Sequence, residues 1–83
     1  MKAEQLRAAR GLIRWSQQEL AQTSGVSVPT IKRLEAMEGE LSGHTATLKA
    51  LALALEGAGV QFIAENGGGA GVRMAKPKGA SNE

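Results

Sequence analysis

The sequence contains no cysteine among its 83 residues, which excludes disulfide bonds and thiolate metal sites and fits a reducing compartment. Only two aromatic residues are present, Trp15 and Phe62, so a core must be built mainly from Leu, Ile, Val and Ala. No stretch approaches the roughly twenty apolar residues of a membrane span, and residues 1–10 lack the apolar run of a signal peptide. We therefore expect a cytoplasmic protein with no membrane partner.

The residues that enzymes and metal sites use are also scarce. His44 is the single histidine, and no cluster of carboxylates accompanies a nucleophile, so neither catalysis nor a metal or other cofactor is expected. The glycine run at 67–69 is not a phosphate loop, because no Gly-Lys-Ser/Thr follows it. From the length we expect one small domain without a separate effector domain. A formal charge of +2 is by itself a weak argument for nucleic acid.

Residues 16–35 predict two short helices joined by a tight turn. Ser16 begins the S-x-x-E pattern of a capping box at the start of the first helix. Gly25 ends that helix, because glycine tolerates a left-handed turn. Ser27 is expected to cap the next helix, which places Pro29 at its second position, although proline prefers the first.

The second of these helices has two chemically different faces. Its apolar residues, Ile31 and Leu34, can pack on the preceding helix if the two cross steeply. The other face is not needed for a core, and it carries Val28, Pro29, Thr30, Lys32 and Arg33. A short helix that exposes its N-terminal end and a basic face suits the major groove of DNA.

This pattern resembles the helix-turn-helix domains of the phage repressor and Cro type. The matching residues, in the family's spacing, are Gln17, Leu20, Ala21, Gly25, Val26, Ser27, Ile31, Leu34 and Glu35. Residues 6–10 and 47–55 match as well, so the resemblance covers roughly residues 3–57. It implies a mainly α fold, a four-helix repressor-like domain that binds DNA. The loop at 36–44 departs from the family, in which Asn-Gly often ends this helix.

Three polar residues are expected near the DNA backbone. Gln17 resembles the family's phosphate-binding glutamine, at a helix N-terminus whose free N–H groups and dipole favour an anion. A merely exposed glutamine is the alternative. Lys32 is expected on a phosphate. Arg14 is equally consistent with a phosphate contact and with a solvated surface arginine.

The exposed helix face is expected to read base edges. Val28 and Pro29 present carbon surface that suits thymine methyl groups, and Thr30 can bond a base edge or a phosphate. Arg33 is expected to read guanine through its planar guanidinium. A solvated helix face is the alternative for the two basic residues. The expected DNA-binding residues are therefore Arg14, Gln17, Ser27, Val28, Pro29, Thr30, Lys32 and Arg33.

Residues 3–13 predict a first helix with an apolar stripe that includes Leu6 and Ala9. Arg10 lies on the same stripe, where a cation is seldom left unpaired. Glu35 is the partner we expect, and the resemblance favours this pair, since the family often has arginine and glutamate at these positions. Exposure of Arg10 to solvent is the alternative. If the pair forms, both residues are structural and do not read DNA.

Residues 45–56 predict a fourth helix, with Thr45 as its cap and a core stripe of Leu48, Leu51, Ala52 and Leu55. Leu53 lies off this stripe, so the helix must also be covered by a later segment or by another chain. Residues 60–64 and 71–74 read as strands around a glycine-rich turn.

The expected division of the chain is a DNA-binding domain at 1–57, a hairpin at 58–75 and a disordered tail at 76–83. A two-stranded hairpin is marginal alone, so it must pack on the fourth helix, pair with another chain, or do both. Repressor-like domains read two half-sites as a two-fold dimer. We therefore expect the dimer to form through Leu53, Val60, Phe62, Ile63 and Val72, with a simple intramolecular cover as the alternative.

The sequence thus predicts a double-stranded DNA-binding transcriptional regulator that acts as a homodimer on an inverted-repeat operator, associated with the nucleoid. Its affinity should come largely from phosphate contacts and fall steeply with salt. Repression by occlusion is expected rather than activation. The alternative is an antitoxin with the same domain, whose C-terminal extension neutralises a toxin. That extension is short and glycine-rich, which offers a protein partner little contact surface.

Overall fold

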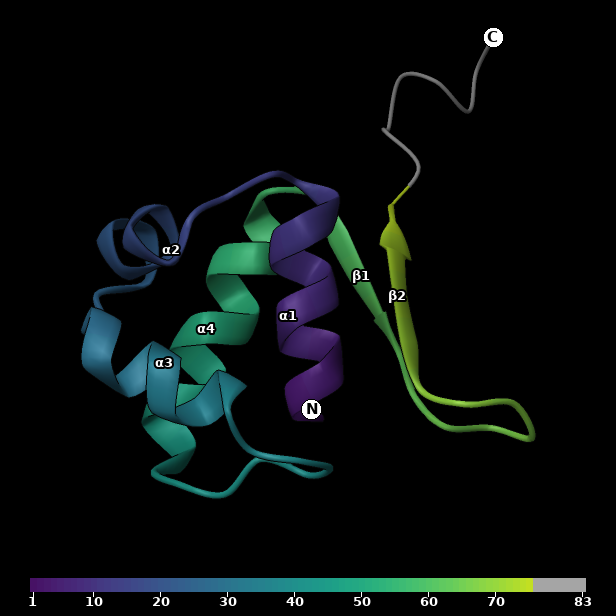
Figure 1. Cartoon of the computed structure of the whole chain (residues 1–83). Coiled ribbons are helices and arrows are strands. Elements are labelled where there is room, and N and C mark those ends of the chain that lie inside the picture. The colour runs from purple at the N-terminus through teal and green to yellow at the C-terminus, as the bar shows by residue number, and fades with distance from the viewer. Residues whose placement is uncertain (76–83) are drawn as a thin grey trace, which may run out of the picture.

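The computed structural model describes residues 1–75 as four helices followed by a two-stranded antiparallel sheet (Figure 1). The elements are α1 (Ala3–Leu12), α2 (Gln17–Ser24), α3 (Val28–Glu35), α4 (Thr45–Gly57), β1 (Val60–Ile63) and β2 (Gly71–Met74). This confirms the predicted fold class, a mainly α domain with a C-terminal hairpin. The predicted tail at 76–83 lies outside the described residues.

The two helices of the central stretch begin and end at the residues that their local chemistry favours. The Ser16 hydroxyl accepts the Glu19 N–H at 3.0 Å, and the Glu19 carboxylate accepts the Ser16 N–H at 2.7 Å. Gly25 follows α2 with φ +80°, the left-handed conformation that glycine adopts without strain. The Ser27 hydroxyl accepts the Thr30 N–H at 3.4 Å, because the proline between them has no N–H.

Three helix termini differ from the prediction, and one of them is the end of α4, at Gly57 rather than at residue 56. The first helix ends at Leu12 rather than at residue 13. Thr45 is the first residue of α4 and not its cap; His44 takes the cap position with an extended backbone and makes no side-chain cap hydrogen bond. Four residues of loop separate Leu12 from α2, and within them the chain reverses through a left-handed residue, Arg14 (φ +58°).

The core is formed jointly by all four helices, the loop after α3 and the first strand. The fully or nearly fully buried apolar residues are Ala3, Leu6, Ala9, Leu20, Ile31, Leu34, Leu41, Leu51, Leu55 and Val60. They include members of each predicted helical stripe, whereas Leu48 and Ala52 of the α4 stripe are only partly buried. Leu41 joins the core because its N–H pairs with the Met1 carbonyl at 3.0 Å, which ties the loop to the chain start.

The hairpin packs on the helices of its own chain. Phe62 is paired with Val72, and β1 contacts α4 and α1 while β2 contacts α1, so the sheet lies beside α1 in Figure 1. Val60 is only 2% exposed, and Phe62 and Val72 also pack on the core. Val60, Phe62 and Val72 therefore pack within the protomer, and their part in a dimer interface stays a prediction.

A buried amide fastens the hairpin to the first helix. Gln5 is nearly fully buried, and its Nε2 donates to the carbonyls of Ile63 (3.1 Å) and Gly71 (2.9 Å), the paired residues at the turn end of the sheet. Its Oε1 accepts the Lys2 N–H at 2.8 Å. Every polar atom of this side chain thus has a partner, as a buried amide requires.

Candidate nucleic-acid interface

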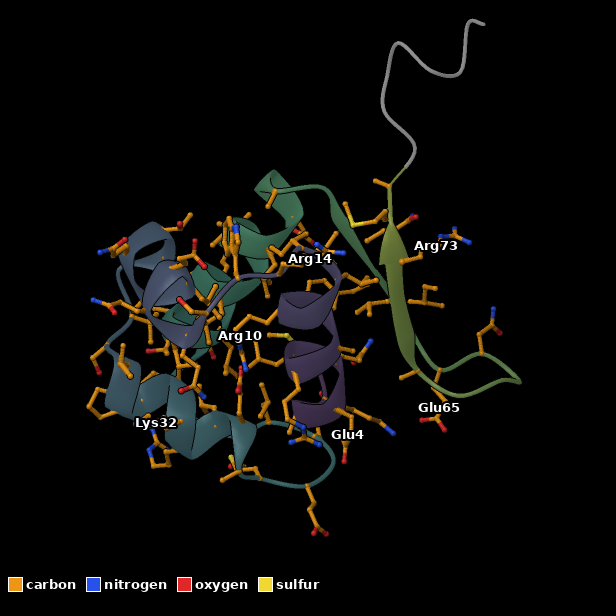
Figure 2. The ribbon with its side chains drawn as sticks, turned by 45° about the horizontal axis from the view of Figure 1, so that its top comes forward. Glu4, Arg10, Arg14, Lys32, Glu65 and Arg73 are labelled. Carbon is orange, nitrogen blue, oxygen red and sulfur yellow. The ribbon has the colours of Figure 1, made fainter. Side chains whose placement is uncertain are left out.

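Helix α3 divides into a buried side and an exposed side. Ile31, Leu34 and Glu35 are buried. The outer residues are exposed (Pro29, Lys32 and Arg33) or half-buried (Val28 and Thr30). Figure 2 shows Lys32 on the outer side of α3, away from the other helices. The arrangement leaves a short basic helix face free to enter a groove while the apolar side stays in the core.

An ion pair between α1 and α3 holds the inner side of this helix. Arg10 Nε lies 2.7 Å from Glu35 Oε2, and Arg10 Nη2 lies 3.0 Å from Glu35 Oε1, the two-pronged geometry of a strong arginine–carboxylate contact. Arg10 Nη1 also donates to the Trp15 carbonyl at 2.8 Å. Both predicted partners therefore meet beneath the exposed face and are absent from it.

Gln17 belongs to the same network. Its Nε2 donates to Glu35 Oε1 at 2.9 Å, so one carboxylate connects α1, α2 and α3. Gln17 is half-buried at the first position of α2, and one N–H of its amide is therefore used inside the protein. Gln17, which the sequence predicts on a phosphate, therefore also links α2 to α3.

The network shifts the proton affinity of both charged partners. Burial raises the pKa of Glu35, but the hydrogen bonds from Arg10 and Gln17 outweigh it and hold that pKa below its usual value. The hydrogen bond to Glu35 raises the pKa of Arg10 despite partial burial. The pair is consequently fully charged at neutral pH.

The loop after α3, residues 36–44, is held by residues to which the sequence pattern assigned no role. Arg7 Nη1 donates to the Glu35 carbonyl, and the Gly39 N–H donates to both Glu4 carboxylate oxygens at 3.3 Å. The amine of Met1 lies 2.8 Å from the Glu40 carboxylate. Glu40 is therefore turned toward the chain start. No local motif could have identified these contacts, because the partners are about 30 or more residues apart.

Arg14 lies apart from the exposed face of α3. Figure 2 shows it and Lys32 at well-separated points of the molecule. Its N–H donates to the Gly11 carbonyl at 3.2 Å, and the Trp15 N–H donates to the Arg10 carbonyl at 3.0 Å. These two bonds form a Schellman turn at the end of α1, with arginine where glycine is usual.

Arg14→Gly is expected to stabilise the protein by about 1 kcal/mol, because a left-handed conformation costs roughly that much for a residue with a Cβ. Thermal and denaturant unfolding would measure the gain. DNA binding of the same variant separates the two interpretations of Arg14: weaker binding at low salt indicates a phosphate contact, and unchanged binding indicates a solvated arginine. A loss of stability would contradict the conformational argument.

A capped helix, a tight glycine turn and a second helix with a buried inner side and an exposed basic outer side define a helix-turn-helix DNA-binding domain. The chain belongs to the helix-turn-helix family of the XRE type, whose pattern matches residues 6–57, and it is therefore a DNA-binding regulator. The match runs from within α1 to the end of α4 and leaves the hairpin outside. No curated protein matches the sequence. Within residues 1–75, no helix is long and apolar enough to cross a membrane.

Proposed function

We propose that the protein is a sequence-specific transcriptional repressor that binds an inverted-repeat operator as a homodimer, with α3 in the major groove. The observation that carries this proposal is the division of α3 into a buried side, anchored by the ion pair at Glu35, and an exposed side with Lys32 and Arg33. A helix anchored in this way can present side chains to base edges in one orientation.

Within this proposal each exposed residue has a role. Arg33 reads guanine, Lys32 and the N-terminus of α2 at Gln17 bind phosphates, and Val28 with Pro29 contacts thymine methyl groups. Ser27 and Thr30 lie at the start of α3, where their hydroxyls bond one another at 2.9 Å. Either hydroxyl can turn to a phosphate or a base edge when DNA binds.

Selection of bound duplexes from a random DNA pool at low ionic strength tests the proposal. We expect an inverted repeat whose half-sites are centred about one helical turn, or a multiple of it, apart. Affinity should fall steeply as salt rises, because counterions are released from the phosphates. Failure to bind any duplex at low salt would refute DNA recognition, and recovery of a single unrepeated site would refute the two-fold arrangement.

For the dimer, we propose the outer edge of β2 as the interface. The Ala75 N–H donates to the Gly59 carbonyl of the neighbouring strand segment. Because the N–H groups of an antiparallel strand point alternately toward and away from the paired strand, those of Val72 and Met74 point away from β1. Among residues 1–75 no strand lies on that side of β2. A second copy can pair with these groups and form a four-stranded sheet.

Met74→Pro is expected to convert the dimer to a monomer, because proline has no N–H to donate to a carbonyl of the partner strand. The hydrogen bonds between β1 and β2 do not use this N–H and are kept. Met74→Ala keeps that N–H and is the matched control. Sedimentation at several concentrations distinguishes the two variants. If both stay dimeric and folded, the β2 edge is not the interface.

Leu53 and Ile63 remain candidates for the same role. Leu53 is 57% exposed and borders an apolar hollow between α2 and α4 that Trp15 and Thr23 also line. Ile63 is half-buried at the turn end of β1. Leu53→Lys, measured in the same sedimentation series, decides whether this hollow belongs to the dimer interface.

The antitoxin alternative is less favoured. It requires the C-terminal extension to present an apolar surface to a toxin, yet the apolar face of the hairpin packs on α1 and α4. A repressor needs no such surface beyond the dimer contact.

A further inference from the structure

Besides the ion pair at Glu35, the first half of α1 makes a second set of contacts to the C-terminal end of α3. Arg7 Nη1 donates to the Glu35 carbonyl and lies 3.5 Å from the Met37 carbonyl. One turn earlier, the Glu4 carboxylate accepts the Gly39 N–H. The Gly39 carbonyl in turn accepts the Ala3 N–H at 2.8 Å. Together these contacts fasten α1 to the backbone of residues 35–39.

The contacts satisfy groups that a short helix leaves free. The last carbonyls of an α-helix have no donor within the helix. In α3, the Lys32 and Leu34 carbonyls accept the N–H groups of Ala36 and Met37, both at 3.1 Å. The Glu35 carbonyl instead accepts from Arg7, whose positive charge is also favourable at the negative end of the helix dipole.

Contacts at one end affect the orientation of the whole of α3, because this helix has only eight residues. Arg10 holds the Glu35 side chain, and Arg7 holds the Glu35 backbone, so two arginines from successive turns of α1 grip the same residue. A guanidinium presents several donors in a fixed plane and can bridge two carbonyls, whereas a lysine ammonium has no such planar fork. The orientation of α3 relative to α1 is thereby fixed at its C-terminal end.

We propose that Arg7, assisted by Glu4, is a positioning residue for base reading by α3. This inference rests on the proposed DNA-binding function. Contacts to base edges require a defined angle of the helix in the groove, whereas phosphate attraction tolerates small rotations. Loosening the end of α3 therefore weakens binding to the correct operator more than binding to unrelated DNA.

The test compares Arg7→Met with the wild-type protein, because methionine keeps an unbranched aliphatic stem and removes the guanidinium. Affinity is measured for the selected operator and for a scrambled duplex of equal length, below the melting temperature of each protein. We expect the operator affinity to fall about tenfold, equivalent to one weakened base contact, and the scrambled affinity to fall no more than about threefold. Arg7→Lys should give an intermediate loss.

Lys49→Met is the matched control, because it removes an exposed positive charge from α4, outside both α3 and the proposed dimer edge, with the same change in charge. Its ratio of operator to scrambled affinity should equal that of the wild type. An unchanged ratio in folded Arg7→Met would overturn the inference. If Arg7→Met does not fold at the assay temperature, Glu4→Gln takes its place, with an expected several-fold fall in the ratio and the same condition for refutation.

Amide hydrogen exchange without DNA separates this inference from the proposed function. Arg7→Met should accelerate exchange at Ala36 and Met37, which close the last turn of α3, while leaving Leu51 and Leu55 in α4 protected as in the wild type. If the wild-type protein binds no duplex, the proposed function fails and base reading by α3 fails with it. Unchanged exchange at Ala36 and Met37 would instead refute only the claim that Arg7 fixes the C-terminal end of α3.

Discussion

Replacing Glu35 by alanine is expected to lower the free energy of unfolding by about 3 kcal/mol, because it leaves the Arg10 guanidinium partly buried without its counter-charge. Glu35 is 6% exposed, and the Arg10 side chain is 23% exposed, which places the effect at the lower end for buried ion pairs. For a chain of this size the melting temperature should fall by more than about 10 °C. Thermal and urea unfolding would measure both quantities.

Glu38→Ala is the control for this variant, because Glu38 is an exposed carboxylate only three residues further along the chain. Its effect should stay within about 0.5 kcal/mol. A melting temperature for Glu35→Ala that equals that of the control would mean that the pair contributes nothing to the fold.

The same pair predicts how stability depends on pH. The folded-state pKa of Glu35 lies below its usual value, so the pair contributes fully above the unfolded value of about 4.3. That contribution is lost as the pH falls through the lower folded value, because there the unfolded chain binds the proton more readily. Glu4 and Glu40 also have lowered pKa values and act in the same direction. The comparison of wild type with Glu35→Gln therefore isolates this one carboxylate, and equal acid slopes would contradict its role.

Combined replacement of Lys32 and Arg33 by alanine is expected to weaken operator binding by at least about a hundredfold at physiological salt. A guanine contact through Arg33 is worth about 1–3 kcal/mol, and loss of a phosphate contact at Lys32 should lower the salt slope by about one. Both side chains are exposed, so unfolding should change little. Fluorescence anisotropy against a salt series would measure affinity and slope together.

Lys49→Ala is the control, since Lys49 is an exposed basic residue on α4, outside both α3 and the proposed dimer edge. This control should retain most of the affinity. If the double variant binds the operator as well as this control does, the outer face of α3 does not read DNA.

Residues whose structural role depends only on residues close to them in the chain could be identified from the sequence. Ser16, Gly25 and Ser27 determine where α2 and α3 begin and end, because a hydroxyl cap or a left-handed glycine acts within about three residues. The helical spacing of apolar residues likewise predicted the helices, and two strand-like runs around a glycine-rich turn predicted the hairpin. The Arg10–Glu35 contact was within reach because a charged residue on an apolar stripe must find a partner.

Contacts between distant parts of the chain could not be identified in this way. Arg7 and Gln5 lie on a helix that looks like any amphipathic helix, and their partners are 28 to 66 residues away. An apolar strand pattern states that one face will be buried. It does not state which chain will cover that face, and only the structure shows that Val60 and Phe62 pack on helices of their own chain.

By itself the sequence determined the helix-turn-helix and the chemistry of its exposed face, because both follow from backbone capping and from a periodicity of 3.6 residues. Only the tertiary structure decided that the hairpin closes the protomer's own core and that Arg7 grips the end of α3. Those outcomes depend on which surfaces meet when the chain is compact, and a one-dimensional pattern contains no such distances.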